Sequence, residues 1–145
     1  MYALDTNLLV YAHNAASPLH GRAKAFVERA MNSRDTEGDA SICLPAQVLM
    51  EFLNVITWYR LEAPLSLIDA MNIAQDYLDT GVTILYQKST QLETLFELLK
   101  SVKTRKKIFD VALAATLKDH DVSGLYTVNT KDFEEFTFLD VKNPL

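Results

Sequence analysis

The sequence has a single cysteine, Cys43, which excludes an internal disulfide and a zinc site built from cysteine thiolates. Its histidines, His13, His20 and His120, lack the spacing of zinc ligands with cysteine. No stretch approaches the roughly 18 uninterrupted apolar residues of a membrane-spanning helix. The segment Met1–Asp5 lacks the basic region and the apolar core of a secretory signal. These absences predict a cytoplasmic protein without a membrane segment.

The sequence also has no excess of positive charge, since its formal net charge is −5 at pH 7. Nucleic acids usually bind basic surfaces, so this balance argues against such a partner for the molecule as a whole. Five basic residues nevertheless crowd into one short segment: Lys100, Lys103, Arg105, Lys106 and Lys107. Cations bound by acidic residues would also make the local charge less negative than the count. A local contact with nucleic acid therefore remains open.

Short runs of β-forming residues alternate with longer runs of helical periodicity. The predicted strands cover 2–4, 41–44, 82–86 and 125–128, with a fifth at an edge within 136–141. Strands separated by helices favour an α/β fold, a three-layer α/β/α sandwich with a mainly parallel sheet of four to five strands. A chain of 145 residues is too short for two ordinary domains, so one domain over residues 1–145 is expected.

Three acidic residues stand where such a sheet would bring them together. Asp5 follows the first predicted strand, Glu51 lies on the helix after the second, and Asp110 lies in the first turn of the most apolar helix. Ligands of α/β sheets bind where the strands end and the helices begin, so these acids are candidate catalytic residues. Each also has a structural explanation: a helix N-cap for Asp5, a solvated flank for Glu51 and a favourable helix-dipole contact for Asp110.

Converging carboxylates repel one another unless a cation balances them. Mg²⁺ and Mn²⁺ prefer oxygen ligands, so Asp5, Glu51 and Asp110 predict a site for either ion. Asn129 and Asp132 follow the fourth predicted strand, where both are ordinary turn residues.

Four short motifs together resemble those of PIN-domain nucleases, and in particular the VapC toxins of toxin–antitoxin pairs. In chain order they are Leu4–Asn7, Pro45 through Glu51-Phe52, Phe109–Ala114 and Thr127–Phe133. The resemblance implies a parallel α/β/α sandwich in which a quartet of acidic positions binds Mg²⁺ or Mn²⁺ and cleaves RNA. Asp5, Glu51 and Asp110 match three of these positions. Asn129 stands at the fourth, where many members have aspartate, and Asp132 is the residue that could compensate.

The resemblance therefore implies a Mg²⁺- or Mn²⁺-dependent endoribonuclease that hydrolyses RNA phosphodiesters to 5′-phosphate and 3′-hydroxyl ends. As the toxin of such a pair it would inhibit translation, form a homodimer and be blocked by a cognate antitoxin. The alternative is a catalytically weak or inactive PIN-like module that binds RNA or protein, which Asn129 favours. Receiver domains and haloacid-dehalogenase phosphatases fit poorly, because Asp5 is followed by Thr6 and Asn7 and not by a second acid.

The basic segment leads directly into the helix that carries Asp110. Its residues Lys103, Arg105, Lys106 and Lys107 are expected to hold the RNA backbone beside the acids. The other interpretation is a solvated, lysine-rich helix end that complements the helix dipole.

The helices around Glu51 carry several large apolar side chains. Trp58 and Tyr59 precede a proline break and are expected at an interface with another protein. Phe52 and Met71 are expected in the core, and His13 is expected at the surface.

Overall fold

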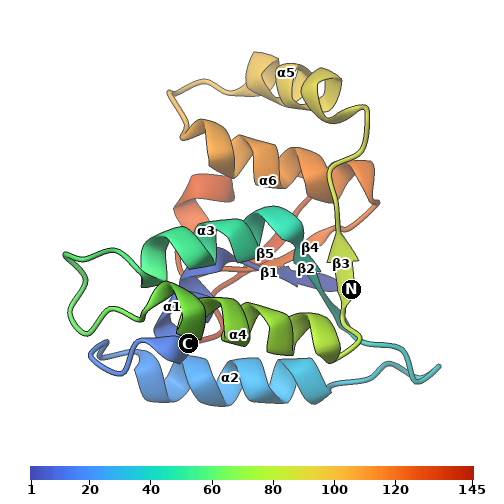
Figure 1. Ribbon diagram of the computed structural model, residues 1–145. Coiled ribbons are helices and arrows are strands. Elements are labelled where there is room, and N and C mark those ends of the chain that lie inside the picture. Colours follow the sequence, from blue (N-terminus) through green and yellow to red (C-terminus); the bar gives the residue numbers. More distant parts are fainter.

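A computed structural model describes all residues from 1 to 145. Its centre is a sheet of five strands in the order β3-β2-β1-β4-β5, and every neighbouring pair is parallel (Figure 1). The strands are β1 (Tyr2–Leu4), β2 (Ile42–Pro45), β3 (Thr83–Leu85), β4 (Gly124–Tyr126) and β5 (Asp140–Lys142). The helices are α1 (Thr6–His13), α2 (His20–Asn32), α3 (Ala46–Ile56), α4 (Leu67–Asp79), α5 (Gln91–Ser101), α6 (Ile108–Asp119) and a short 3₁₀ helix, η1 (Thr130–Phe133).

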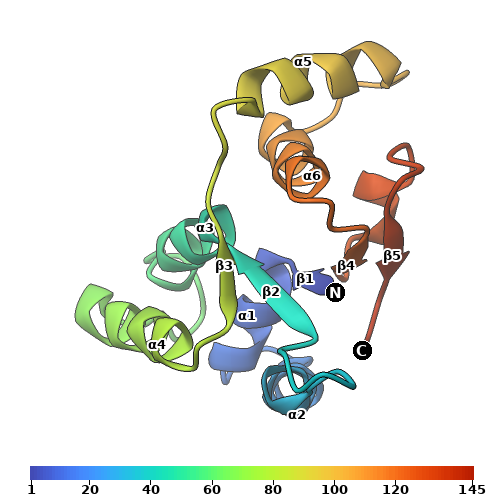
Figure 2. The same cartoon turned by 90° about the vertical axis from the view of Figure 1, so that its right-hand side faces the viewer.

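The order of the strands decides which helices cover which face of the sheet. β1, β2 and β3 step toward one edge, and the connection from β3 then returns to β4 on the far side of β1. Because crossovers between parallel strands are right-handed, the returning connection must cover the opposite face. Accordingly, α5 and α6 lie on one side of the sheet, and α2 and α4 lie on the other (Figure 1, Figure 2). The predicted three-layer α/β/α architecture is confirmed.

The fifth strand begins later than the apolar run 136–141 predicts. The N–H groups of Phe136 and Leu139 bond to the carbonyls of Phe133 and Phe136, so the chain turns here and does not extend. Both phenylalanines are buried, which explains the apolar character of the run without a strand. β5 therefore covers only Asp140–Lys142, at the predicted edge position beside β4.

The core is one cluster of 32 buried apolar residues, and Phe52 is among its largest members. Burying a side chain of this size stabilises the fold by about 2–3 kcal/mol. Cys43 is buried as well, and burial raises the pKa of its thiol to about 12, so it is an unreactive packing residue.

Between β1 and β4, Tyr2 lies opposite Gly124, and a Cβ at Gly124 would come within 2.6 Å of the tyrosine ring. Only glycine admits the ring at this point.

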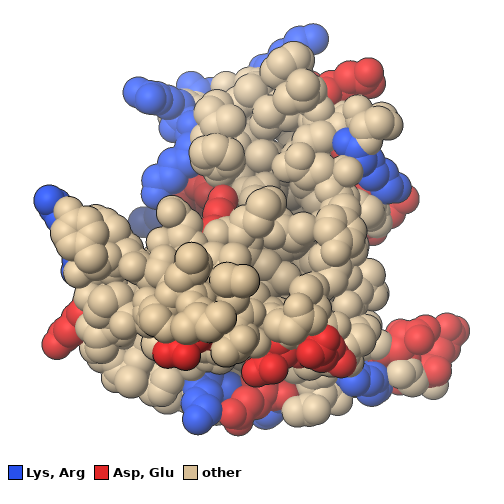
Figure 3. Space-filling view, viewed as in Figure 1, with Lys and Arg blue, Asp and Glu red and all other residues tan.

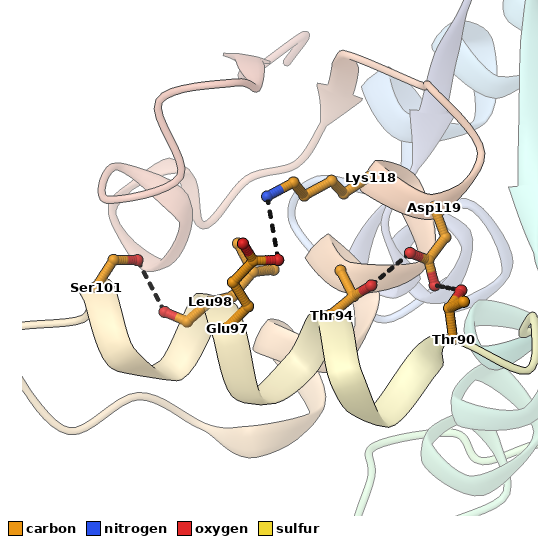
Figure 4. A network of polar contacts seen from close by, with 7 residues as sticks. All are labelled: Thr90, Thr94, Glu97, Leu98, Ser101, Lys118 and Asp119. Carbon is orange, nitrogen blue, oxygen red and sulfur yellow. Dashed lines mark hydrogen bonds and ion pairs between the residues drawn. The ribbon is translucent and has the colours of Figure 1, made fainter.

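The helix α5 is held to the sheet through α6. Asp119, at the end of α6, accepts hydrogen bonds from Thr90 Oγ1 at 3.0 Å and from Thr94 Oγ1 at 2.5 Å (Figure 4). The ion pair of Lys118 with Glu97 is exposed and 3.9 Å long, so it contributes little. The hydrogen bonds at Asp119 thus fix the two helices that flank the basic segment.

The strand β1 lies between β2 and β4. From β1 the chain adds β2 and β3 on one side of β1, and it then crosses back to add β4 and β5 on the other side. Open α/β sheets bind ligands beyond the carboxyl ends of their strands at such a switch point. Asp5 and the residues that follow β4 lie at this point of the sheet. None of the helices has the length and apolar character needed to span a membrane.

Candidate active site

Asp5 directly follows β1 and is the N-cap of α1. Its Oδ1 accepts a hydrogen bond from the Thr6 backbone N–H at 2.7 Å, and its Oδ2 accepts from Thr127 Oγ1 at 2.6 Å and from Asn7 Nδ2 at 3.0 Å. Burial raises the pKa of this carboxyl, which is only 8% exposed, whereas its hydrogen bonds with Thr127 and Thr6 lower that pKa. Asp5 is therefore both a helix cap and a rigidly oriented acid at the switch point.

Two polar residues that orient Asp5 were not indicated by the sequence alone. The buried hydroxyl of Thr127 donates to Asp5 and accepts from Asn7 Nδ2 and from the Asn129 N–H, each at 3.0 Å. Asn7 Oδ1 in turn accepts from the Val128 N–H at 3.3 Å. These bonds tie the loop after β4 to the end of β1. A threonine at a strand end is equally typical of a β-branched core position, so no sequence signal separates the two roles.

Glu51 lies on α3 and is half-buried, as its position beside the apolar stripe predicts. Its Oε2 accepts a hydrogen bond from Thr6 Oγ1 at 2.9 Å, and its Oε1 accepts from Gln47 Nε2 at 3.0 Å. Gln47 Nε2 also lies 2.8 Å from the carbonyl of Phe109 and donates to it. Gln47 thus orients Glu51 and joins α3 to the first turn of α6. The sequence alone did not indicate this role.

Asp110 lies in the first turn of α6 and is half-buried. Burial raises its pKa to about 6, and the negative charges of Asp5, Asp132 and Glu51 add to this effect. The positive charge of Lys107 lowers this pKa, but no hydrogen bond to the carboxylate helps to lower it. A favourable contact with the helix dipole therefore does not describe Asp110 fully, because burial and its acidic neighbours both disfavour its charged form.

The three acids line one pocket of about 430 Å³, together with Asn129 and Lys107. Residues far apart in the chain thus meet at the carboxyl edge of the sheet, as the topology predicts. Asp132 is near enough for its charge to raise the pKa values of Asp5 and Asp110, but it lines an adjacent hollow with Asn129.

The chemistry of the pocket fits a hard divalent cation. Its polar lining offers carboxylate, amide and hydroxyl oxygens, which are ligands of Mg²⁺ and Mn²⁺ and not of soft metals. Burial is the main cause of the raised pKa values of Asp5 and Asp110, and the negative charges of neighbouring acids add to it. A bound cation would offset both effects. No group of three or more Asp, Glu, His or Cys side chains is so arranged that it could hold an ion. The acids therefore share a pocket without forming a compact set of ligands.

The basic segment borders this pocket. Lys107 lines it, and Arg105, Lys106 and Lys107 line a second hollow beside it. Figure 3 shows basic side chains gathered near the start of α6, with acidic atoms in the hollow next to them. Lys106 differs from the others because it pairs with Glu135 at 3.5 Å and is largely covered. The free positive charge beside the acids comes from the exposed members of the segment.

Two expectations for other side chains are wrong. His13 is half-buried and not at the surface: its Nε2 lies 2.7 Å from the Tyr77 hydroxyl, and burial lowers its pKa. Met71 is 50% exposed and not in the core, because it lies on the outer face of α4. Trp58 and Tyr59 are exposed as predicted, and so are their neighbours Leu67 and Ile68 on α4.

The fold and the pocket define a small α/β/α protein with an acidic site at the switch point of its sheet. The sequence matches the PIN domain family over residues 2–139. Because this match covers nearly all of the chain, the chain belongs to the PIN-domain family.

Its relatives within the family are named ribonucleases. It is 32% identical to ribonuclease VapC33 of Mycobacterium tuberculosis over 97% of this chain and 96% of that protein. It is 28% identical to ribonuclease VapC24 of the same organism, over 100% of this chain and 97% of the relative.

Solved structures agree on the fold. A toxin–antitoxin complex from Klebsiella pneumoniae is similar with a TM-score of 0.67 and 21% identity, over 100% of this chain and 98% of that one. Mycobacterium tuberculosis VapC20, described as a sarcin–ricin loop cleaving toxin, is similar with a TM-score of 0.69 and 19% identity, over 99% and 100%.

Proposed function

We propose that the protein is a Mg²⁺- or Mn²⁺-dependent endoribonuclease. The observation that carries this proposal is the single pocket at the switch point that Asp5, Glu51 and Asp110 line beside Lys107. The relatives named ribonuclease VapC, which match almost the full length of the chain, support RNA as the substrate.

The roles of the residues follow from their positions. Asp5, Glu51 and Asp110, which share the pocket without forming a compact set, would draw together to hold the cation, with Asn129 or Asp132 completing the set. When bound, the cation supplies a Lewis acid that polarises the phosphodiester and acidifies the attacking water. Thr127 and the backbone of Thr6 fix the orientation of Asp5. The exposed members of the basic segment, Lys103, Arg105 and Lys107, hold the RNA backbone, while Lys106 anchors the segment through Glu135.

RNA cleavage with and without metal tests this function. Wild-type protein should cut single-stranded RNA in Mn²⁺ or Mg²⁺ and stop cutting in EDTA. Asp5→Asn, Glu51→Gln and Asp110→Asn should each lower the rate at least a hundredfold, on the order expected for lost electrostatic stabilisation. Asp69→Asn is the matched control, because Asp69 is an exposed acid on α4. Retained activity in Asp110→Asn would remove the assignment of this pocket.

A toxin of a toxin–antitoxin pair is the biological role that the relatives support, since a similar structure is a toxin–antitoxin complex. An exposed apolar surface on the α3–α4 hairpin fits a protein partner: it contains Trp58, Tyr59, Leu67, Ile68 and Met71. We expect an antitoxin encoded beside the gene to bind the protein and to reverse the slowed translation that its overexpression causes. We also expect a homodimer, which sedimentation at micromolar concentration tests.

A non-catalytic module that binds RNA or protein is the second candidate function. Asn129 favours it, because an amide adds no charge to the pocket and the acids do not form a compact set. Metal titration at high protein concentration separates the two functions: RNA binding without any Mn²⁺-dependent cleavage would identify the module. In that case Asn129→Asp should restore measurable cleavage.

A further inference from the structure

Phe109 is the most exposed phenylalanine among the large apolar side chains at the surface, at 70%. In the sequence it lies two residues after Lys107 and directly before Asp110, and both of these residues line the acid pocket. Its ring therefore contributes little to the core, although the middle of its helix, from Val111 to Leu117, is buried. Together with Met50 and Val55, which are also exposed and line the same hollow, it forms an apolar patch beside the acids, and such patches mark binding sites.

Phe109 forms one wall of a groove of about 500 Å³ between α3 and α6. The groove is mostly apolar, with Met50 and Val55 on the α3 side and the amide of Asn54 at its rim. Glu51 and Val55 line both this groove and the acid pocket, so the two hollows are adjacent. A ligand in the groove would thus lie next to the acids.

The polar group at the floor of the groove is incomplete. Gln47 is 7% exposed, and its Oε1 is buried without a hydrogen-bond partner. Its Nε2 is already engaged with Glu51 and the Phe109 carbonyl. A buried acceptor left unpaired costs free energy, which an N–H group supplied by a ligand would recover.

We propose that this groove binds a nucleobase of the RNA, stacked on Phe109, next to the phosphodiester that is cleaved. This inference rests on the proposed ribonuclease function and names the part of the substrate that the groove takes. Single-stranded RNA is recognised by stacking its bases on exposed aromatic rings while amides meet the base edges. The basic segment precedes Phe109 in the chain and would hold one phosphate next to that base, whereas a cation held by the acids would hold the phosphodiester that is cleaved.

The experiment measures binding apart from cleavage. The probe is a short fluorescein-labelled single-stranded RNA in EDTA at low salt, and fluorescence anisotropy gives its Kd. Phe109→Ala and Phe109→Leu should weaken binding roughly five- to a hundredfold, whereas Phe109→Trp should keep it. The matched control is Phe96→Ala, because Phe96 is 57% exposed on α5 and does not line the groove.

A series of probes in which one abasic residue moves along the RNA locates the stacked base. For the wild type, the abasic residue at one position should remove most of the affinity for the RNA. For Phe109→Ala, the probe with that abasic residue should bind as well as the intact RNA does. Equal binding of Phe109→Ala and the wild type would overturn the inference. A second result would also overturn it: sedimentation shows that the wild type is a dimer and Phe109→Ala a monomer, while both bind RNA equally. The groove would then be a contact between two copies of the chain.

Mn²⁺-dependent cleavage by the wild type is measured alongside. If the wild type cuts RNA but the Phe109 variants bind and cut as well as it does, the groove assignment fails and the ribonuclease function stands. If the wild type neither binds nor cuts any RNA, both fail.

Discussion

At the scale of single residues, Asp110 couples the site to stability. Its pKa is about 6 in the folded protein against 3.8 for the ordinary side chain, so the folded state holds its proton more tightly. The stability that this proton adds is complete below about pH 4 and is lost as the pH rises through about 6. Without metal, we therefore expect Asp110→Asn to gain stability relative to the wild type as the pH rises from 4 to 7. The gain should be about 1 kcal/mol, since the half-exposed carboxyl is partly screened by solvent.

Urea unfolding of both proteins in EDTA across this pH range measures the difference. A difference that stays constant with pH would show that folding does not raise the pKa of Asp110, either by burial or through its acidic neighbours. Asp69→Asn, at an exposed position, should show no such trend.

Gln47 offers a second test at this scale, because its amide orients Glu51 and also binds the Phe109 carbonyl. Gln47→Met keeps the size of the side chain and removes both hydrogen bonds. Since partners that orient metal ligands are typically worth 10- to 100-fold in metal affinity, we expect about a tenfold weaker Kd for Mn²⁺. Electron paramagnetic resonance of free Mn²⁺ measures this affinity.

The chain provides a matched control for Gln47. Gln75 donates to Asp79 at 2.8 Å with the same four-residue spacing, but at the surface of α4. Gln75→Met should leave the affinity for Mn²⁺ unchanged. If Gln47→Met lowered only the free energy of unfolding, Gln47 would be a packing residue and not a positioning one.

At the scale of elements, the segment between α5 and α6 sets the charge beside the pocket. Arg105 and Lys107 are exposed there, so each is expected to neutralise one RNA phosphate. Changing both to glutamine should flatten the slope of log K against log salt concentration by about 1.4, at about 0.7 for each contact on a single strand. Lys24→Gln with Arg29→Gln on α2 is the control pair. Equal slopes for all three proteins would show that the segment does not contact RNA.

The elements themselves were largely predictable from the sequence. The strands are short and apolar, and the helices have clear periodicity. The alternation of strands and helices leaves few possible topologies for the sheet. The run 136–141 was predicted as a strand, but Phe136 is buried in a turn. A short apolar run does not distinguish a strand from a turn that packs on the core.

The convergence of the acids was also predictable, since Asp5 ends a strand and Asp110 begins a helix, and in a parallel sheet strand ends and helix starts meet at one edge. Their hydrogen-bond partners were not. Thr127 and Gln47 act through side-chain geometry that depends on how α3, α6 and the β4 loop pack together. The exposure of Phe109 was not predictable either. The first turn of its helix is apolar on most sides, so the sequence does not indicate which side faces solvent.

At the scale of the whole molecule, metal binding and folding should be linked through the acids. A ligand that binds only the folded state stabilises it by about 2.7 kcal/mol at a concentration one hundred times its Kd. For a protein of this size that corresponds to roughly 10 °C in Tm. We expect Mg²⁺ or Mn²⁺ to raise Tm by this amount at pH 7.5, where Asp110 is ionised. The increase should shrink at pH 5, because protons then compete with the cation for a carboxyl whose pKa is about 6.

Differential scanning calorimetry at both pH values measures this linkage, with Ca²⁺ as a second hard cation and Asp110→Asn as the reference protein. The variant should gain little from Mg²⁺ at either pH, since it lacks one of the carboxylates that hold the cation. An equal increase in the wild type at pH 5 and pH 7.5 would mean that the cation binds elsewhere on the surface. Because the net charge of −5 provides many weak sites for cations, only the dependence on both pH and Asp110 identifies the pocket as the place where the ion stabilises the fold.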